Sequence, residues 1–305
     1  MPTALVVGQG SIGERHARLL GDLGLDVAVV SRHGARAKAA SFPALEDALA
    51  EVNPDYVVVA NETAAHRPTL VALAAAGFAG RVLVEKPLFD RLAAVPQHRF
   101  AASFVGYNLR FHPVLQELAG VLADERAISA HLYVGQYLPD WRPGRDYRET
   151  ASASRQAGGG VLRDLSHELD YLTWLFGRCD RLAALGGRFS TLEIDSDDVQ
   201  GLLLAFERCP VVTAQLNYLD RRGTRNLIVN TGKRTFVADL IRSTLSIGSE
   251  EKAFPLGRDD TYLAQHRRVL GNAHEGLCTL GEGGAVLELI AAAEAAAATG
   301  QWVRL

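Results

Sequence analysis

Apolar residues in the first hundred positions form short continuous runs, and segments with helical spacing separate these runs. Continuous runs are typical of strands that are buried on both faces of a parallel sheet, with helices as the covering layers. Helical spacing is clearest at 43–52 and 69–76. We therefore predict a doubly wound parallel α/β domain over residues 1–105. The expected strands lie at 4–7, 27–30, 55–60, 81–84 and 104–106.

Alternating apolar and polar positions are characteristic of the second half of the chain. Short turns such as 221–223 join neighbouring runs, which favours antiparallel pairing. One helix is expected at 161–176, a second at about 283–298, and a short closing strand at 301–303. We predict a second domain over residues 106–305, an α+β unit with a large, mainly antiparallel open sheet. Its expected strands lie at 127–138, 182–192, 198–206, 210–219, 224–230 and 234–247.

The turn after the first strand reads Gly8-Gln9-Gly10-Ser11-Ile12-Gly13. A strand, such a turn, a helix and a second strand form the phosphate-binding half of a dinucleotide fold. Gly8 allows the sharp turn, Gly10 lets a pyrophosphate approach the backbone, and Gly13 lets the helix pack on the strand. The backbone amides of Ser11 and Ile12, at the start of the helix, would face the phosphates. The alternative is a glycine turn that binds nothing.

The end of the second strand distinguishes the two nicotinamide cofactors. An acidic residue about 20 positions beyond the glycines would bind the ribose 2′-hydroxyl of NAD. That place holds Ser31 and Arg32 with no carboxylate, and Asp26 precedes the strand. A hydroxyl and a guanidinium suit a 2′-phosphate. We therefore predict NADP(H) rather than NAD(H); the alternative is that Arg32 is a solvated loop residue.

Composition narrows the class of protein further. The 305 residues are 48% hydrophobic and carry a formal net charge of −3, which favours a globular protein and gives no indication of a nucleic-acid partner. Three widely spaced cysteines form neither a disulfide framework nor a metal-binding pattern. No signal peptide and no membrane-spanning run is recognisable. We therefore expect a cytoplasmic protein without a metal site.

The fourth strand runs into Glu85-Lys86-Pro87. Ligands of a parallel sheet bind at the carboxyl ends of its strands, so Lys86 lies where a reacting group would lie. The residue before a proline is held extended, and the peptide bond between them can be cis. A lysine held there could stabilise a developing alkoxide. The alternative is an ordinary solvated lysine.

A triple glycine, 158–160, precedes the helix expected at 161–176. With about 100° per residue, four leucine and phenylalanine side chains share one stripe of this helix. The opposite stripe would carry Asp164, His167, Glu168 and Tyr171. Histidine is the natural proton acceptor near neutral pH, which makes His167 a candidate base. The alternative is a solvent-exposed polar face.

Aromatic and basic residues gather in the loop that follows the first strand of the second domain. Trp141 and Tyr147 could stack on the face of a sugar, and Arg142 could hold a carboxylate or phosphate. This favours a substrate site for an acidic or nucleotide-linked sugar; the alternative is an interface loop. Arg110 is a second candidate anion ligand, or else part of a structural salt bridge. His16, His66 and His112 are expected to pack or cap rather than catalyse.

The ordered set of motifs resembles the glucose–fructose oxidoreductase/inositol dehydrogenase (GFO/IDH/MocA) family over nearly the whole chain. The resemblance rests on the glycine turn, Asn61 to His66, 85–87, 105–113, the triple glycine with Asp164 and His167, and 299–303. It implies a Rossmann domain followed by an α/β domain whose open sheet often forms a subunit interface, so a homodimer or homotetramer is expected.

The same resemblance implies NAD(P)-dependent oxidation or reduction of a sugar, nucleotide sugar or cyclitol. Lys86 would work in catalysis with Asp164 and His167. Asn61, His66, Glu85 and Lys86 would lie beside the cofactor. The partners would be small sugar-like molecules, not nucleic acid or membrane.

The chain departs from the family pattern in three places. Asp164 and His167 are three residues apart instead of four, which turns their relation on a continuous helix from about +40° to about −60°. Glu168 or Tyr171 is therefore an alternative for the relay role of Asp164. Residues 61–63 read Asn-Glu-Thr where the family often has Thr-Pro-Asn, which alters the contacts expected beside the nicotinamide ribose. The segment 87–104 contains a proline, so the helix usual there would be reduced or absent.

Two other activities remain open at this point. One is a glycosidase of the same family type that uses a tightly held NAD as a transient oxidant. The other is a non-catalytic regulator that senses the cofactor. The presence of both Lys86 and His167 argues against a regulator, which needs neither side chain.

Overall fold

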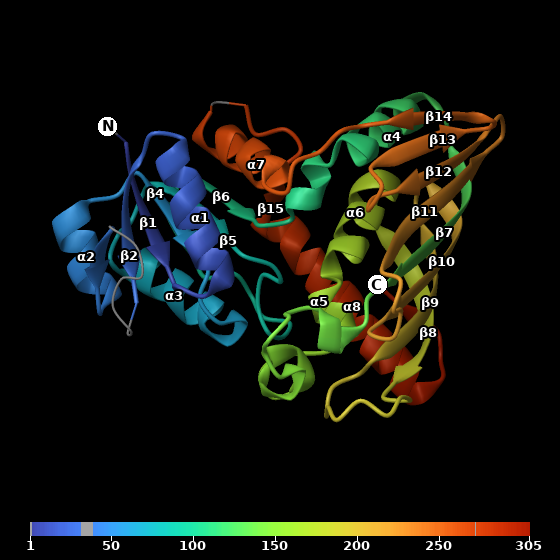
Figure 1. Ribbon diagram of the computed structural model, residues 1–305, viewed down its shortest axis with the longest axis horizontal. Coiled ribbons are helices and arrows are strands. Elements are labelled where there is room, and N and C mark those ends of the chain that lie inside the picture. Colours follow the sequence, from blue (N-terminus) through green and yellow to red (C-terminus); the bar gives the residue numbers. More distant parts are fainter. Residues whose placement is uncertain (1, 32–38, 272) are drawn as a thin grey trace. The chain divides into compact units, whose positions relative to one another are not determined.

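Two compact units make up the chain in the computed structural model. The first unit comprises the residues up to Phe111 together with Arg258–Gly284, and the second comprises His112–Gly257 with Ala285–Leu305. Each unit contains a sheet of its own (Figure 1). The structure describes residues 2–31, 39–271 and 273–305.

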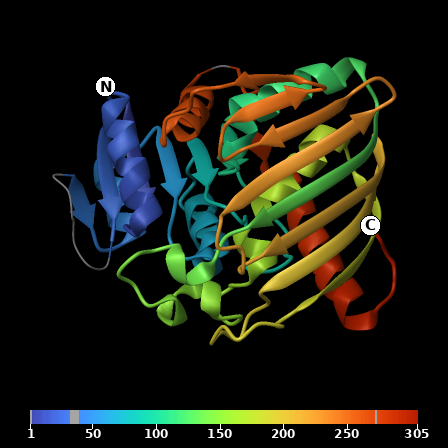
Figure 2. The same ribbon diagram turned by 45° about the vertical axis from the view of Figure 1, so that its right-hand side comes forward.

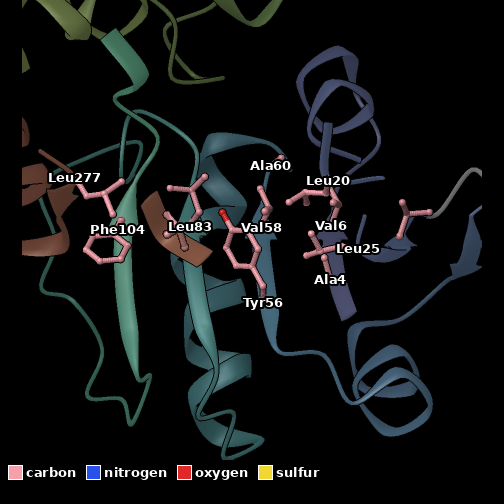
Figure 3. Close-up of a cluster of buried hydrophobic side chains, with 12 residues drawn as sticks. Ala4, Val6, Leu20, Leu25, Tyr56, Val58, Ala60, Leu83, Phe104 and Leu277 are labelled. Carbon is pink, nitrogen blue, oxygen red and sulfur yellow. The ribbon is translucent and has the colours of Figure 1, made fainter. Parts of the chain in front are cut away.

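A parallel sheet forms the centre of the first unit. Within the described residues it has seven strands, in the order β15-β6-β5-β4-β1-β2-β3, and only β15 runs antiparallel to its neighbour. The predicted continuous apolar runs become its buried strands, and their side chains form the core shown in Figure 3. The doubly wound parallel fold is thereby confirmed. The strands are β1 Thr3–Val7, β2 Asp26–Val30, β3 Ala40–Phe42, β4 Tyr56–Val59, β5 Arg81–Val84, β6 Ala102–Val105 and β15 Cys278–Thr279.

The helices of the first unit connect these strands. Right-handed crossovers place α1 on one face of the sheet, and α2 and α3 on the other, because the chain reverses its direction across the sheet after β3. Helix α7 comes from the segment that returns late in the sequence, and it packs on α1. The helices are α1 Ser11–Asp22, α2 Leu45–Val52, α3 Thr63–Ala75 and α7 Asp260–Leu270.

The carboxyl ends of the central parallel strands are aligned. Val7 pairs with both Val30 and Val59, and Val84 pairs with Val59 as well. The turn or loop after each of these strands therefore begins at the same rim of the sheet. This is the rim at which ligands of such folds bind.

A second, mainly antiparallel sheet forms the centre of the second unit. Within the described residues it has nine strands, in the order β14-β13-β12-β11-β7-β10-β9-β8-β16, and only β7 and β10 pair in parallel. The expected antiparallel open sheet is thereby confirmed. The strands are β7 Ala127–Gly135, β8 Cys179–Gly187, β9 Val199–Phe206, β10 Cys209–Asn217, β11 Thr224–Thr231, β12 Thr235–Asp239, β13 Thr244–Ile247, β14 Glu250–Ala253 and β16 Val303–Arg304.

Helices cover one face of this second sheet, and no helix of the described residues covers the other face (Figures 1 and 2). The exposed face carries apolar side chains, among them Leu185 and Val211, which are 76% and 50% exposed. The helices of the unit are α4 Pro113–Asp124, α5 Val161–Asp164, α6 Ser166–Phe176 and most of α8, Leu280–Thr299.

One predicted strand is wrong in extent, because the run 234–247 forms the two strands β12 and β13. The Asp239 side chain ends β12 by accepting hydrogen bonds from the amides of Ile241 and Arg242, each at 2.9 Å. An aspartate that binds amides two and three residues ahead makes a turn. Apolar spacing resumes after this turn, so the hydrophobic pattern alone reads as one strand.

Two helices, α4 and α7, are absent from the sequence-based expectation. Helix α4 begins after His112, whose Nδ1 accepts a hydrogen bond from the Val114 amide at 3.3 Å. Its first residue is Pro113, which is favoured at that position. Helix α7 has Asp260 in its first turn and two arginines in its last, the charge order that suits the helix dipole. Both signals are local and could have found the helices.

The segment that returns late in the sequence also differs from the predicted division into domains. Residues 258–284 belong to the first unit, although the predicted boundary near residue 105 places them in the second. The segment 88–101 contains no helix among its described residues, as its proline predicted.

Candidate functional site

The glycine turn has the geometry that a dinucleotide cradle needs. Gly8 has a φ of 102°, and a Cβ there would lie 2.5 Å from the Asn61 backbone. A Cβ on Gly13 would lie 2.1 Å from the carbonyl oxygen of Gly8, so helix α1 packs directly on the turn. A Cβ on Gly10, by contrast, would have no described atom within 4 Å. The space beside Gly10 and the exposed helix start at Ser11 therefore fit a pyrophosphate.

The end of β2 lies at the same rim. Ser31 follows this strand directly, and its amide donates a hydrogen bond to the Phe42 carbonyl at 2.9 Å. Arg32 lies outside the described residues. The expected preference for NADP(H), which depends on Arg32, stays a prediction.

His66 fastens helix α3 to the loop after β5. Its Nδ1 lies 3.1 Å from the Pro87 carbonyl oxygen and 3.2 Å from that of Leu88, and its Nε2 lies 3.2 Å from the Asn61 carbonyl oxygen. Burial lowers the pKa of His66, so the ring is neutral near neutral pH. These backbone contacts agree with the expectation that His66 packs rather than catalyses.

Glu85 and Lys86 follow β5 at the rim, and the Lys86–Pro87 peptide bond is cis. The Glu85 carboxylate accepts hydrogen bonds from His16 Nε2 at 2.8 Å and from the Lys86 amide at 3.1 Å. Burial would raise the pKa of the Glu85 carboxyl, but the His16 hydrogen bond and the Lys86 charge lower that pKa below its ordinary value. Glu85 is therefore an anion beside Lys86, whose side chain is half-buried.

The helix after the triple glycine is not continuous. Helix α5 ends at Asp164 and helix α6 begins at Ser166, because Leu165 between them has a ψ of 31°. The angular relation expected between Asp164 and His167 on one regular helix is therefore wrong. Both side chains are half-buried. They belong to the second unit, whereas Lys86 belongs to the first.

A buried tyrosine holds the Asp164 carboxylate. The hydroxyl of Tyr218, just after β10, donates a hydrogen bond to Asp164 Oδ2 at 2.6 Å. Burial and the Asp164 charge raise the pKa of Tyr218 well above its ordinary value, so the phenol keeps its proton. The Tyr218 ring also meets Trp141 edge-on, with 5.3 Å between ring centroids. Within the second unit, these contacts join the candidate relay to the candidate substrate loop.

The expected polar face of this helix is wrong for two of its four members. Glu168 is fully buried, and Arg225 Nε lies 2.8 Å from its Oε1. Tyr171 is fully buried as well. The Glu168 carboxylate already has a structural partner, which leaves Asp164 as the half-exposed carboxylate of the helix pair.

Three arginines of the loop 141–148 have exposed side chains. Arg148 forms ion pairs with Asp146 and Glu193, each at 2.7 Å. The side chains of Arg142 and Arg145 are exposed and form no ion pair with a described residue. Trp141 beside them is fixed by a hydrogen bond from its indole N–H to the Gln136 carbonyl at 3.0 Å. The loop therefore offers two cations next to a held aromatic ring.

Arg110 has a structural role in the first unit. It is 1% exposed, and its Nη1 lies 2.9 Å from Glu282 Oε1. This is the structural salt bridge that stood as the alternative to anion binding. The expectation that Arg110 binds a substrate anion is corrected accordingly, because its guanidinium is buried and paired with Glu282.

Replacing Tyr218 by phenylalanine tests the hydrogen bond between Tyr218 and Asp164. The ring and its packing remain, but a hydrogen bond to a charged carboxylate is lost, so the free energy of unfolding should fall by about 1.5–3 kcal/mol. Urea denaturation measures the change. Tyr137→Phe is the matched control, because the Tyr137 hydroxyl forms no hydrogen bond with a described residue, and its stability should stay unchanged. Equal stability of the two variants would contradict the inferred hydrogen bond.

Among the described residues, no group of three or more His, Cys, Asp or Glu side chains is arranged to hold a metal ion. Within the same residues, no helix has both the length and the apolar character that a membrane crossing requires.

Two family models match the chain. Residues 3–103 match the model described as an oxidoreductase family with an NAD-binding Rossmann fold, and residues 122–237 match the GFO/IDH/MocA C-terminal domain. A curated relative, an uncharacterized oxidoreductase of Synechocystis sp., is 32% identical over 156 residues. That match covers 47% of this chain and 40% of the relative, so less than half of the relative's length is represented.

Solved structures share the fold of the whole chain. GenD2 from gentamicin A biosynthesis, solved with NAD, is 23% identical with a TM-score of 0.82, and the match covers 100% of this chain and 96% of that one. The WlbA dehydrogenase of Bordetella pertussis, solved with NADH and UDP-GlcNAcA, is 20% identical with a TM-score of 0.82 and covers 100% and 99%. At these identities the likeness shows the fold.

Proposed function

Because the chain belongs to the GFO/IDH/MocA family of oxidoreductases, we propose that it is an NADP(H)-dependent dehydrogenase or reductase. Its substrate would be a hydroxyl or carbonyl group of a sugar-like molecule. The observation that carries the proposal is the position of Lys86. It follows β5 at the same rim at which the glycine turn follows β1.

The cofactor would be held by the residues of that rim. The amides of Ser11 and Ile12 would bind the pyrophosphate beside Gly10, while Asn61 and His66 would border the ribose. When bound, the nicotinamide supplies or accepts the hydride. The chain contributes alignment and electrostatics.

Three side chains of this chain would handle the proton and the charge. In oxidation, His167 accepts the proton of the substrate hydroxyl, and the Lys86 ammonium stabilises the alkoxide that develops. Asp164, which Tyr218 holds at 2.6 Å, would orient the imidazole. In reduction, the same groups return the proton.

The substrate we favour is an acidic or nucleotide-linked sugar. Arg142 and Arg145 are exposed cations that pair with no carboxylate among the described side chains, and Trp141 beside them offers an aromatic face. Guanidinium groups bind phosphates and carboxylates, and aromatic rings stack on sugars. WlbA was solved with NADH and the nucleotide sugar UDP-GlcNAcA.

A panel of neutral sugars, sugar acids, cyclitols and UDP-sugars, each assayed with NADP and NAD, tests the proposal. We expect a change in the absorbance of the reduced nicotinamide, largest with an anionic sugar. Glycoside hydrolysis without net absorbance change would support the glycosidase instead. No turnover, together with a partner protein that binds only when the cofactor is present, would support the regulator.

Replacing Arg32 by alanine tests the cofactor preference. Loss of charge-assisted hydrogen bonds to the 2′-phosphate should raise the KM for NADPH about tenfold to a hundredfold and leave that for NADH unchanged. Arg267→Ala, which removes an exposed arginine of α7 in the same unit, should change neither constant. Preference for NADH in the unmodified protein, or an Arg32 variant with the original preference, would disprove the assignment.

The exposed face of the nine-stranded sheet is the surface through which we propose that copies of the chain associate. Leu185, Leu203, Val211 and Ile128 lie exposed on strands or at the end of strands of this sheet. Apolar side chains gathered on one face favour a dimer or tetramer. Light scattering of the purified protein would determine the number of subunits.

A further inference from the structure

Four buried side chains of the first unit form a line of hydrogen bonds that ends at Glu85. Tyr56 Oη lies 3.0 Å from His266 Nδ1, His266 Nε2 lies 2.8 Å from His16 Nδ1, and His16 Nε2 lies 2.8 Å from Glu85 Oε1. The four residues come from β4, α7, α1 and the end of β5. Three of them are 0% exposed, and Glu85 is 7% exposed. Tyr56 belongs to the core cluster drawn in Figure 3.

A Tyr56 hydroxyl that donates at one end and a Glu85 carboxylate that accepts at the other give the hydrogen bonds of this line one common direction. The Tyr56 hydroxyl needs an acceptor, and among the described residues its partner is His266 Nδ1. Burial lowers the pKa of His266 well below its ordinary value, so that ring is neutral and its proton lies on Nε2. In that direction, His266 Nε2 donates to His16 Nδ1, and His16 Nε2 donates to the Glu85 carboxylate.

Glu85 links this line of hydrogen bonds to Lys86. Its other oxygen, Oε2, accepts the Lys86 amide at 3.1 Å. Just after the neighbouring strand β6, a Cβ at Gly106 would lie 2.9 Å from Glu85 Oε1, so the missing side chain leaves room for the carboxylate. The position of the Lys86 backbone is thus tied to a carboxylate that is itself fixed from the far side by His16.

Joining two helices through a line of buried polar groups carries a free-energy cost. Each member must be hydrogen-bonded or it destabilises the fold, whereas apolar side chains of the same volume carry no such cost. Helices α1 and α7 are already joined at the surface by the ion pair of Arg18 with Asp259 at 2.5 Å. The line therefore does more than attach α7 to α1.

We propose that His16 and His266 are positioning residues for Lys86, which they hold in place through the Glu85 carboxylate. The inference rests on the role proposed for Lys86 above. It gives the returning segment 258–284 a part in the reaction, because His266 comes from that segment. A fixed lysine matters because a displacement of about 1 Å in a reacting group costs about a hundredfold in rate.

The experiment replaces His266 by leucine and by glutamine. Leucine can neither accept from Tyr56 nor donate to His16, so kcat on the best sugar of the panel should fall at least about tenfold while the KM for NADPH changes little. Glutamine can do both, and it should restore most of kcat. Arg18→Ala removes the surface ion pairs of Arg18 with Asp259 and Asp22 and leaves the buried line intact, so it should leave kcat unchanged.

A spectroscopic measurement checks the line without any substrate. Nitrogen-15 NMR of the imidazole rings should show a proton on Nε2 of His16, and His266 as a single tautomer with its proton on Nε2. In Tyr56→Phe, which keeps the ring and removes the hydroxyl, His266 should become a mixture of tautomers. This variant also serves if His266→Leu fails to fold, since it releases the same constraint with a smaller change.

The outcomes separate this inference from the proposed function. If Lys86→Ala loses turnover while folded His266→Leu and Tyr56→Phe keep kcat within about twofold, the positioning role is overturned and the function stands. NMR spectra that show His16 Nε2 without a proton would overturn it as well. If Lys86→Ala keeps full turnover, it is the proposed function that fails.

Discussion

Replacing Lys86 by alanine should lower kcat by about a hundredfold to a thousandfold, the usual cost of removing one group that stabilises a developing oxyanion. The affinity for NADPH should stay nearly unchanged, because the glycine turn and the start of α1 would carry most of the cofactor contacts. Steady-state kinetics on the best sugar of the panel, with NADPH binding followed by fluorescence, separate the two effects.

Two further variants control this experiment. Lys233→Ala removes an exposed lysine from the turn between β11 and β12 and should leave turnover unchanged. Lys86→Arg keeps the charge but replaces a compact ammonium by a planar guanidinium, so it should recover only part of the loss. Turnover of Lys86→Ala close to that of the unmodified protein would refute the assigned role.

Replacing Gly13 by alanine should remove cofactor binding and destabilise the first unit. The new Cβ would lie 2.1 Å from the Gly8 carbonyl oxygen and 2.9 Å from its carbonyl carbon, both of them backbone atoms that cannot rotate away. Helix α1 must therefore move off the turn. We expect the free energy of unfolding to fall by about 1–3 kcal/mol, as for other overpacked sites. NADPH titration and urea denaturation measure the two losses.

The same helix provides the matched control. Gly21 lies exposed near the end of α1, and beyond its chain neighbours and the backbone of its own helix, no described atom lies within 4 Å of a Cβ built there. Alanine is favoured over glycine in helices, so Gly21→Ala should stabilise the protein by up to about 1 kcal/mol and keep cofactor binding. If Gly13→Ala behaved like Gly21→Ala, the close packing of α1 on the turn would be disproved.

Residues of the candidate site could be predicted where neighbouring residues in the sequence define their position. The spacing of Gly8, Gly10 and Gly13, which lie close together in the sequence, predicts the turn that they form. Lys86 could be placed because a continuous apolar strand precedes it and a proline follows. Tyr218 and His266 were missed, because each is an ordinary buried aromatic residue until its partner is known.

Spacing within a helix was less informative than the turn and strand signals. The leucines of 161–176 keep a helical stripe through the break at Leu165, so the pattern predicts one helix where there are two. Glu168 has the spacing of an exposed polar residue. It is buried, because Arg225 from β11 provides the opposite charge.

The sequence by itself determined most of the strands, the parallel and antiparallel halves, and the glycine turn, because each depends on residues a few positions apart. Only the tertiary structure decided which polar side chains are partners. His16 meets His266 across 250 positions, Arg110 meets Glu282 across 172, and Asp164 meets Tyr218 across 54. A buried polar group must find a partner, and no local pattern says which distant residue the fold will bring to it.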